Sequence, residues 1–250
     1  MNKKNIENNL HELYRTMGAL HRKEPSFSHG AEYVDCEPYN WPRTFFGSAD
    51  TEELERTAKA VRKGILPAQW ILLRSENYPD FYPKLEAAGF RKMMTWPGMG
   101  MDLDQTDFSS QPSGNVKLIE SEAELQQWLD IVNKVLFGRE PVAFALFETC
   151  WRSGLFGFYG AVEAGEIVAT AMTFKTGTDI GIYMVATTEA HRRKGLARKI
   201  TLQILKDAKT NDGKNAYLQA SQMGTHLYKS LGFESFCIFD IYWLLSVGKP

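Results

Sequence analysis

The nine residues HRRKGLARK, His191–Lys199, decide how the C-terminal half of this chain is interpreted. They follow a strand-like run that ends near Thr187 and precede a run with helical periodicity that begins near Gly195. Residues at intervals of four positions share one apolar face of this predicted helix: Leu196, Ile200, Ile204 and Ala208, with Leu202 and Leu205 widening it. The basic stretch is therefore predicted to lie at a helix N-terminus.

Basic side chains at a helix N-terminus indicate a bound anion or a solvated turn. The N-terminus carries a partial positive charge and unpartnered N–H groups, so cations alone are misplaced there. Gly195 and the small Ala197 would let the backbone approach a bulky phosphate group. A solvated basic turn is the alternative, but the order strand, basic loop, glycine, helix favours an anion site.

Two ordered motifs resemble a known family. Arg192-x-x-Gly195-x-Ala197 is similar to the Q/R-x-x-G-x-G/A signature of the GNAT-type N-acetyltransferase superfamily. Downstream, Ser221-x-x-Gly224-x-x-Leu227-Tyr228-x-x-x-Gly232-Phe233 resembles the family's N-x-x-A-x-x-L-Y-x-x-x-G-F. The resemblance covers residues 115 to 245 and implies an acetyltransferase that uses acetyl-CoA and needs no metal.

The resemblance also implies a set of cofactor-binding residues. The backbone at the end of the fourth strand of this half would pair with the pantetheine arm, and the N–H groups of residues 193–198 would hold the pyrophosphate. Ser221 replaces the usual Asn, which shortens the side chain that would reach the cofactor. The implied set is Val185, Ala186, Thr187, Arg192, Arg193, Lys194, Gly195, Leu196, Ala197, Arg198 and Ser221.

Tyr228 matches the family tyrosine that donates a proton to the departing thiolate. A phenol is protonated at neutral pH, so its chemistry suits that role. The alternative for Tyr228 is an aromatic side chain that packs under the last strand. A general base is not identified: Asp179, Tyr183 and Glu148 are candidates, and each is expected to be structural.

The pattern of the C-terminal half predicts a mixed α/β (α+β) fold with a mostly antiparallel twisted sheet flanked by helices. A strand at NVKLIE precedes a helix from Ser121, where Ser121 and Glu124 form a capping-box pattern, and a second helix over 141–152. Three strand-like runs joined by glycine turns predict an antiparallel meander. After the long helix come a strand at NAYLQA, a short helix ended by Gly232, and a final strand pair or long strand.

The N-terminal half repeats part of this order. KLEAAGF, 84–90, aligns with LYKSLGF, 227–233, and both halves read helix, strand, helix, Gly-Phe, strand. We therefore expect a tandem GNAT-like fold whose N-terminal half is degenerate. Leu85 occupies the position of Tyr228, and no cofactor motif precedes it, so this half should not bind CoA. Its aromatic residues are expected in the core or, less favoured, in a cleft wall: Tyr39, Trp41, Phe45 and Phe46.

The polar, turn-rich stretch SSQPSG suggests the domain limits. The prediction is a degenerate N-terminal domain over 1–108, a linker over 109–114, and an acetyltransferase domain over 115–250. Both domains have an ordinary size.

Composition narrows the function classes. With 29 basic and 30 acidic residues, the net charge of −1 gives no global attraction to nucleic acid or membranes. Cys36, Cys150 and Cys237 lie far apart in no metal-binding pattern, and the N-terminus is too polar for a signal peptide, so a cytoplasmic protein is expected.

Three functions remain open. The first is transfer of an acetyl group to a primary amine of a small molecule or peptide, by a monomer or homodimer. The second is a non-catalytic CoA-binding sensor or scaffold. A nucleic-acid-binding module is a distant third, because no broad basic face is evident.

Overall fold

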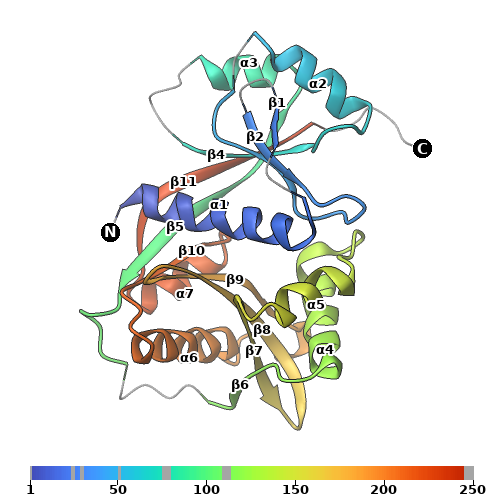
Figure 1. Ribbon diagram of the computed structural model, residues 1–250. Helices are drawn as coiled ribbons and strands as arrows, with labels where there is room; N and C mark the ends of the chain where they lie inside the picture. Colours follow the sequence, from blue (N-terminus) through green and yellow to red (C-terminus); the bar gives the residue numbers. More distant parts are fainter. Residues whose placement is uncertain are drawn as a thin grey trace. The chain divides into compact units, whose positions relative to one another are not determined.

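The chain folds into two compact units, and each unit is built from two stretches of the sequence (Figure 1). This computed structural model describes residues 2–23, 26–28, 31–49, 52–74, 80–108 and 114–244, with 27 and 28 described by their backbone. Unit 1 comprises Met1–Leu13 and Gly98–Phe236, and unit 2 comprises Tyr14–Pro97 and Cys237–Pro250. The predicted linker lies outside the described residues except for Gly114, so the predicted domain limits stay a prediction.

The sheet of unit 1 is mixed. Its strands follow the order β5 (Arg91–Asp102), β10 (Asn215–Gln219), β9 (Asp179–Thr187), β8 (Glu166–Thr176), β7 (Phe156–Glu163) and β6 (Val116–Leu118). β7, β8 and β9 form the predicted antiparallel meander, whereas β9 and β10 are parallel because α6 connects them.

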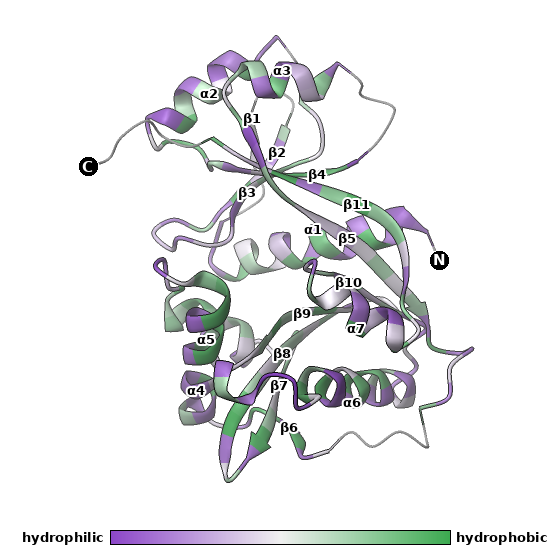
Figure 2. Cartoon of the chain, turned by 180° about the vertical axis from the view of Figure 1, so that it is seen from behind, coloured by the Kyte–Doolittle hydropathy of each residue, from purple (hydrophilic) through white to green (hydrophobic). Residues whose placement is uncertain are grey.

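Helices flank this sheet. They are α4 (Glu122–Val132), the π-helix η1 (Asn133–Phe137), α5 (Phe144–Arg152), the 3₁₀-helix η2 (Glu189–His191), α6 (Leu196–Thr210) and α7 (Gly224–Ser230), with the first part of α1 (Lys3–Leu20). Residues 167–174 of β8 are buried without alternation, which shows that both faces of the strand are covered. Figure 2 shows the hydrophobic colour along β7, β8 and β9.

The predicted helix over 141–152 is wrong at its start. α5 begins at Phe144, because the side chain of Asn133 holds the backbone of Val142 in an extended segment. The Asn133 amide donates to the Val142 carbonyl at 3.1 Å and accepts from the Val142 N–H at 2.8 Å. Pro141 therefore lies three residues before the helix and not in its first turn.

The predicted cap of α4 is confirmed. The Ser121 hydroxyl accepts a hydrogen bond from the Glu124 N–H at 3.3 Å. The Glu124 carboxylate reaches back to the N–H of Glu120, at 2.9 Å, one residue earlier than a standard capping box. These contacts fix where the helix begins.

The strands of unit 2 are also paired in mixed directions. They follow the order β1 (Ser26–Ser28), β2 (Ala31–Asp35), β3 (Arg43–Phe46), β4 (Gln69–Leu73) and β11 (Glu234–Trp243). The helices α2 (Leu54–Arg62) and α3 (Phe81–Ala87) pack on them through a core that includes Phe45, Trp70 and Leu85. Phe45 and Phe46 are core residues, as expected, whereas Tyr39 and Trp41 are half-buried.

The internal repeat is present in the structure. α2, β4, α3 and β5 follow each other as α6, β10, α7 and β11 do. Gly89 and Gly232 both adopt positive φ, +105° and +98°, and each precedes a buried phenylalanine. The fold is thus tandem, with a twisted mixed sheet flanked by helices.

The strand after each Gly-Phe pair is divided between the units. Residues 98–102 of β5 pair with β10 in unit 1, and residues 239–243 of β11 pair with β4 in unit 2. The repeat is therefore completed by exchange: each half of the sequence gives the end of its last strand to the unit formed mainly by the other half.

The sequence pattern did not predict helix α1. Its first part contacts β8 and β9 of unit 1 through the buried side chain of Asn9. The Asn9 amide donates to the Thr176 hydroxyl at 2.8 Å, and its oxygen accepts from the Tyr183 hydroxyl. A Cβ at Gly181 would lie 1.9 Å from the Asn9 oxygen, so this close approach requires glycine on β9. In the described part of the chain, no helix is long and apolar enough to cross a membrane.

Candidate active site

The basic stretch lies where the sequence placed it, in the loop that leads from β9 into α6. Gly195 is the N-cap of α6 and has φ +74°, in the left-handed region. The first helical hydrogen bond runs from the Lys199 N–H to the Gly195 carbonyl at 3.0 Å. The N–H groups of residues 196–198 therefore have no acceptor within the helix, and they point out of its N-terminus.

The space beside Gly195 is open. A Cβ built on Gly195 meets no described atom within 4 Å. A left-handed glycine at a helix N-terminus with open space beside it is an arrangement that can accept a phosphate group. We call residues 192–198 the anion loop.

The side chains of the anion loop contact neighbouring elements. Arg192 donates to the Thr187 carbonyl at 3.4 Å, and Arg198 donates to the Ser230 hydroxyl at 3.2 Å at the end of α7. Lys194 donates to the Glu163 carboxylate at 3.0 Å. Backbone groups, rather than these engaged side chains, are thus the more open part of the loop.

The end of β9 leaves its parallel partner. The ladder between β9 and β10 ends at Ile182 and Leu218, whereas β9 continues to Thr187. A register shift opposite Thr170 and Met172 accompanies a positive φ of +50° at Met184, and the Thr170 hydroxyl donates to the Met184 carbonyl at 3.0 Å. This bulge bends β9 where Val185, Ala186 and Thr187 begin.

Tyr228 lies on α7 in the core of unit 1. Its ring packs edge-on against Phe233, with centroids 5.8 Å apart, and the side chain is 6% exposed. Burial raises the pKa of the Tyr228 phenol above its ordinary value of 10.0. The group therefore stays protonated at neutral pH and can act as a proton donor.

Two motif residues support the position of Tyr228. The Ser221 hydroxyl accepts from the Gly224 N–H at 3.1 Å in the turn that precedes α7. A Cβ at Gly224 would lie 3.1 Å from the Tyr228 ring, so a larger residue there would require a small shift of the ring. The structure gives Ser221 a local contact, and its contact with a cofactor stays a prediction.

The three candidate bases are engaged in structural contacts. Asp179 accepts from the Asn215 amide at 2.8 Å, and Glu148 accepts from Arg152 at 3.0 Å. Tyr183 donates to Asn9. That each residue is structural rather than catalytic stays a prediction.

Part of the chain matches a known protein family. Residues 122–233, somewhat less than half of the 250 residues, match the model of the Acetyltransferase (GNAT) family. This range is similar to a GNAT acetyltransferase domain. The motifs that the sequence analysis quoted, 192–197 and 221–233, both lie inside the matched range.

Solved structures extend the likeness to most of the chain. A GCN5-related N-acetyltransferase from Kribbella flavida aligns with a TM-score of 0.68 at 16% identity, covering 94% of this chain and 95% of that one. One from Sphaerobacter thermophilus aligns at 0.62 and 14% identity, covering 94% and 90%. A tandem GNAT protein from the clavulanic acid biosynthesis pathway aligns at 0.59 and 13% identity, covering 88% and 80%. Likeness at these identities establishes the fold. A search of curated proteins found no match.

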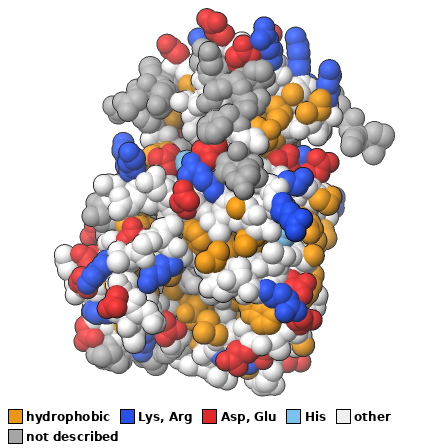
Figure 3. Space-filling model, in the orientation of Figure 1, with side chains coloured by type: hydrophobic (Ala, Val, Ile, Leu, Met, Phe, Trp, Pro, Cys, Tyr) orange, Lys and Arg blue, Asp and Glu red, His pale blue; other side chains and the backbone are white. Residues whose placement is uncertain are grey.

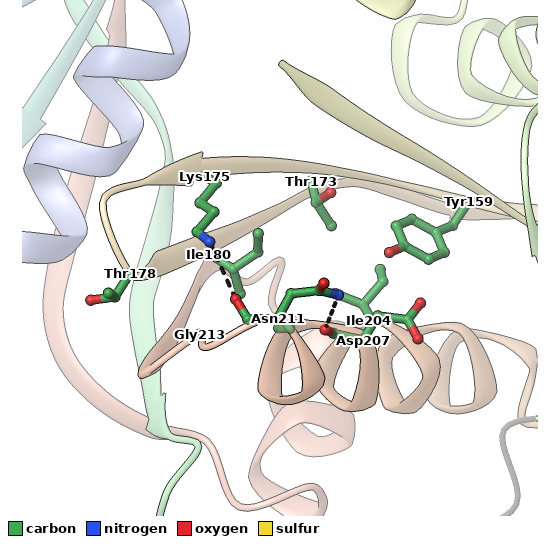
Figure 4. A pocket seen from close by; sticks show the side chains of 10 residues that line it. Tyr159, Thr173, Lys175, Thr178, Ile180, Ile204, Asp207, Asn211 and Gly213 are labelled. Carbon is green, nitrogen blue, oxygen red and sulfur yellow. Dashed lines mark hydrogen bonds between the residues drawn. The ribbon is translucent and has the colours of Figure 1, made fainter. Parts of the chain in front are cut away.

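A separate cavity of about 110 Å³ lies at the other end of α6 in unit 1 (Figure 4). Tyr159, Lys175 and Asp207 line it, and Lys175 donates to the Asn211 carbonyl at 3.3 Å. Eleven residues of helix separate Leu196 from Asp207, about 16 Å along the axis at 1.5 Å per residue. The cavity is therefore not part of the anion loop.

Charges of both signs alternate on the face that Figure 3 shows. This mixture agrees with the net charge of −1 and gives no broad basic face there. Among the described residues, no three His, Cys, Asp or Glu side chains are grouped to hold a metal ion.

Sequence reasoning missed two residues that shape the site. Glu163, which holds Lys194, lies 31 positions away in the sequence, and no local pattern links the two. The positive φ of Met184 likewise has no signature, since methionine rarely marks a bulge. The contact between Glu163 and Lys194 and the backbone conformation of Met184 both depend on which strands become neighbours.

Proposed function

We propose that the protein transfers an acetyl group from acetyl-CoA to a primary amine of a small molecule or peptide. The family match supports acyl transfer as the general chemistry. The single observation that carries the finer proposal is the anion loop: a left-handed Gly195 with open space beside it at the N-terminus of α6. That geometry fits the pyrophosphate of acetyl-CoA.

In this proposal the backbone binds the acetyl donor and three side chains assist it. The N–H groups from Arg193 to Arg198 hold the pyrophosphate, and the bent end of β9, residues 185–187, pairs with the pantetheine arm. Arg192, Lys194 and Ser221 assist at the rim. The bound donor supplies the acetyl thioester.

The transfer is direct. The neutral amine of the acceptor attacks the thioester carbonyl, so that a C–N bond forms and the C–S bond breaks within a ternary complex. Tyr228 gives its proton to the departing thiolate, and water removes the proton from the attacking amine. Tyr228 is protonated at neutral pH, as this role requires, although the burial that raises its pKa also makes the phenol a weaker acid.

A cytoplasmic location is part of the proposal. Cys36, Cys150 and Cys237 are odd in number and far apart in the sequence, with no Cys-x-x-Cys pattern, so the sequence suggests no disulfide framework. Reduced thiols are typical of a cytosolic protein.

The test is a two-part assay on the full chain. Isothermal titration with acetyl-CoA should give saturable binding, and a thiol-release assay over a panel of primary amines should show turnover with at least one. Absence of acetyl-CoA binding refutes the proposal. Binding without turnover across small-molecule and peptide amines supports instead a CoA-binding sensor or scaffold.

A further inference from the structure

The acidic side chain of Glu163 lies against the anion loop. The Glu163 carboxylate accepts from the Lys194 ammonium at 3.0 Å and lies 3.8 Å from Nε2 of His191. Nδ1 of His191 in turn lies 2.8 Å from the Thr188 hydroxyl. Glu163 therefore contacts both ends of the segment that leads into Gly195.

The hairpin between β7 and β8 places Glu163 beside the anion loop. It is the last residue of β7, and the turn that follows, Ala164 and Gly165, has φ of +51° and +86°. Two consecutive positive φ values form the tight hairpin turn that matches the twist of the strands. On the other side of the contact, Arg193 and Gly195 both have positive φ, so Lys194 lies between two left-handed residues.

The contact is electrostatic in effect. The hydrogen bond from Lys194 lowers the pKa of the Glu163 carboxyl below its ordinary value, so the group is ionised at neutral pH. A carboxylate and a phosphate are alternative partners for one ammonium group, and they repel each other when both are near it.

We propose that Glu163 competes with the phosphates of the acyl donor for Lys194 and thereby weakens donor and product affinity. The inference rests on the proposed function, since it assumes that the anion loop holds acetyl-CoA. Its consequence is that release of CoA is faster than an all-basic loop would allow. Glu163 is in this sense a positioning residue, because it acts through Lys194.

The hairpin supplies a matched control. Glu166 is the cross-strand partner of Glu163 in the hairpin register, and it is an exposed carboxylate at the start of β8. Glu163→Gln and Glu166→Gln change the net charge equally and lie at the same turn. They differ in the contact with Lys194.

The experiment measures the Kd of acetyl-CoA and CoA by isothermal titration for wild type, Glu163→Gln, Glu166→Gln, Lys194→Gln and the double variant Glu163→Gln/Lys194→Gln. Glu163→Gln should bind both ligands about two- to fivefold more tightly, the range expected for one exposed ion pair. Glu166→Gln should change Kd less. The gain should shrink in 0.5 M salt because screening weakens exposed charges.

The double variant tests whether Glu163 affects donor binding through Lys194. With Lys194 replaced, the Glu163→Gln substitution should lose most of its effect. Equal Kd values for Glu163→Gln and Glu166→Gln, or a gain that persists without Lys194, overturn the inference. Thermal unfolding of each variant verifies that it is folded. If wild type itself fails to bind acetyl-CoA, the proposed function falls and this inference falls with it.

Discussion

Gly195→Ala separates the backbone strain of the anion loop from its binding role. Gly195 has φ +74°, and an added Cβ meets no described atom within 4 Å. The substitution therefore costs strain alone, about 1–2 kcal/mol for a non-glycine residue in the left-handed region. For a chain of this size, that loss lowers Tm by roughly 2–8 °C.

Binding should respond much more than stability. The new Cβ projects into the open space that the proposal assigns to the pyrophosphate, so we expect the Kd of acetyl-CoA to rise at least about tenfold, or about 1.4 kcal/mol. Gly154→Ala is the matched control, since Gly154 has φ +69° and equally open surroundings within unit 1, in the turn between α5 and β7. It should lose similar stability and keep its affinity.

Differential scanning calorimetry and isothermal titration provide the two readouts. Similar losses of Tm in both variants, with weaker acetyl-CoA binding in Gly195→Ala alone, support the anion loop as the cofactor site. Wild-type affinity in Gly195→Ala, together with the expected loss of Tm, refutes the reasoning, because a Cβ in the proposed phosphate site would then do no harm.

Three further predictions concern other parts of the structure. Tyr228→Phe keeps the ring that packs on Phe233 and removes the proton donor, so turnover should fall about 100-fold with little change in the Kd of CoA; unchanged kcat removes Tyr228 from the mechanism. Gly181→Ala places a Cβ 1.9 Å from the Asn9 oxygen and should lower the free energy of unfolding by about 1–3 kcal/mol in urea titration; wild-type stability would contradict the docking of α1. Burial raises the phenol pKa of Tyr14, Tyr159 and Tyr228 above 10.0, so their contribution to stability is complete below pH 10 and is lost as the pH rises further. Chemical denaturation at pH 8 to 11.5 should show this decline, and a flat profile above pH 10 would count against the burial of these phenols.

The site was largely predictable where its signals are local. Arg192, Gly195 and Ala197 are close in the sequence, and helical periodicity after Gly195 predicts where α6 begins. Tyr228 follows from a motif within one short helix and its flanks. Glycine is favoured at position 195 because residues with a side chain adopt left-handed backbone less readily.

Other parts of the site depend on contacts between distant residues. The pairing of Lys194 with Glu163 requires the β7–β8 hairpin to end beside the anion loop. The docking of Asn9 on β9 requires α1 to lie over Gly181. Helix α1 has an apolar face at helical spacing, formed by Ile6, Leu10, Leu13 and Met17. The burial of Asn9 beside that face depends on neighbours that the local sequence does not reveal.

The sequence by itself determined the two motifs, the alternation of strands and helices, and the repeat of helix, strand, helix, Gly-Phe and strand in both halves. The tertiary structure alone decided that the ends of β5 and β11 are exchanged between the two units. The physical reason is that backbone hydrogen bonds are the same for every strand: alternation of side chains specifies that a segment is a strand, whereas its partner is chosen by packing over the whole chain.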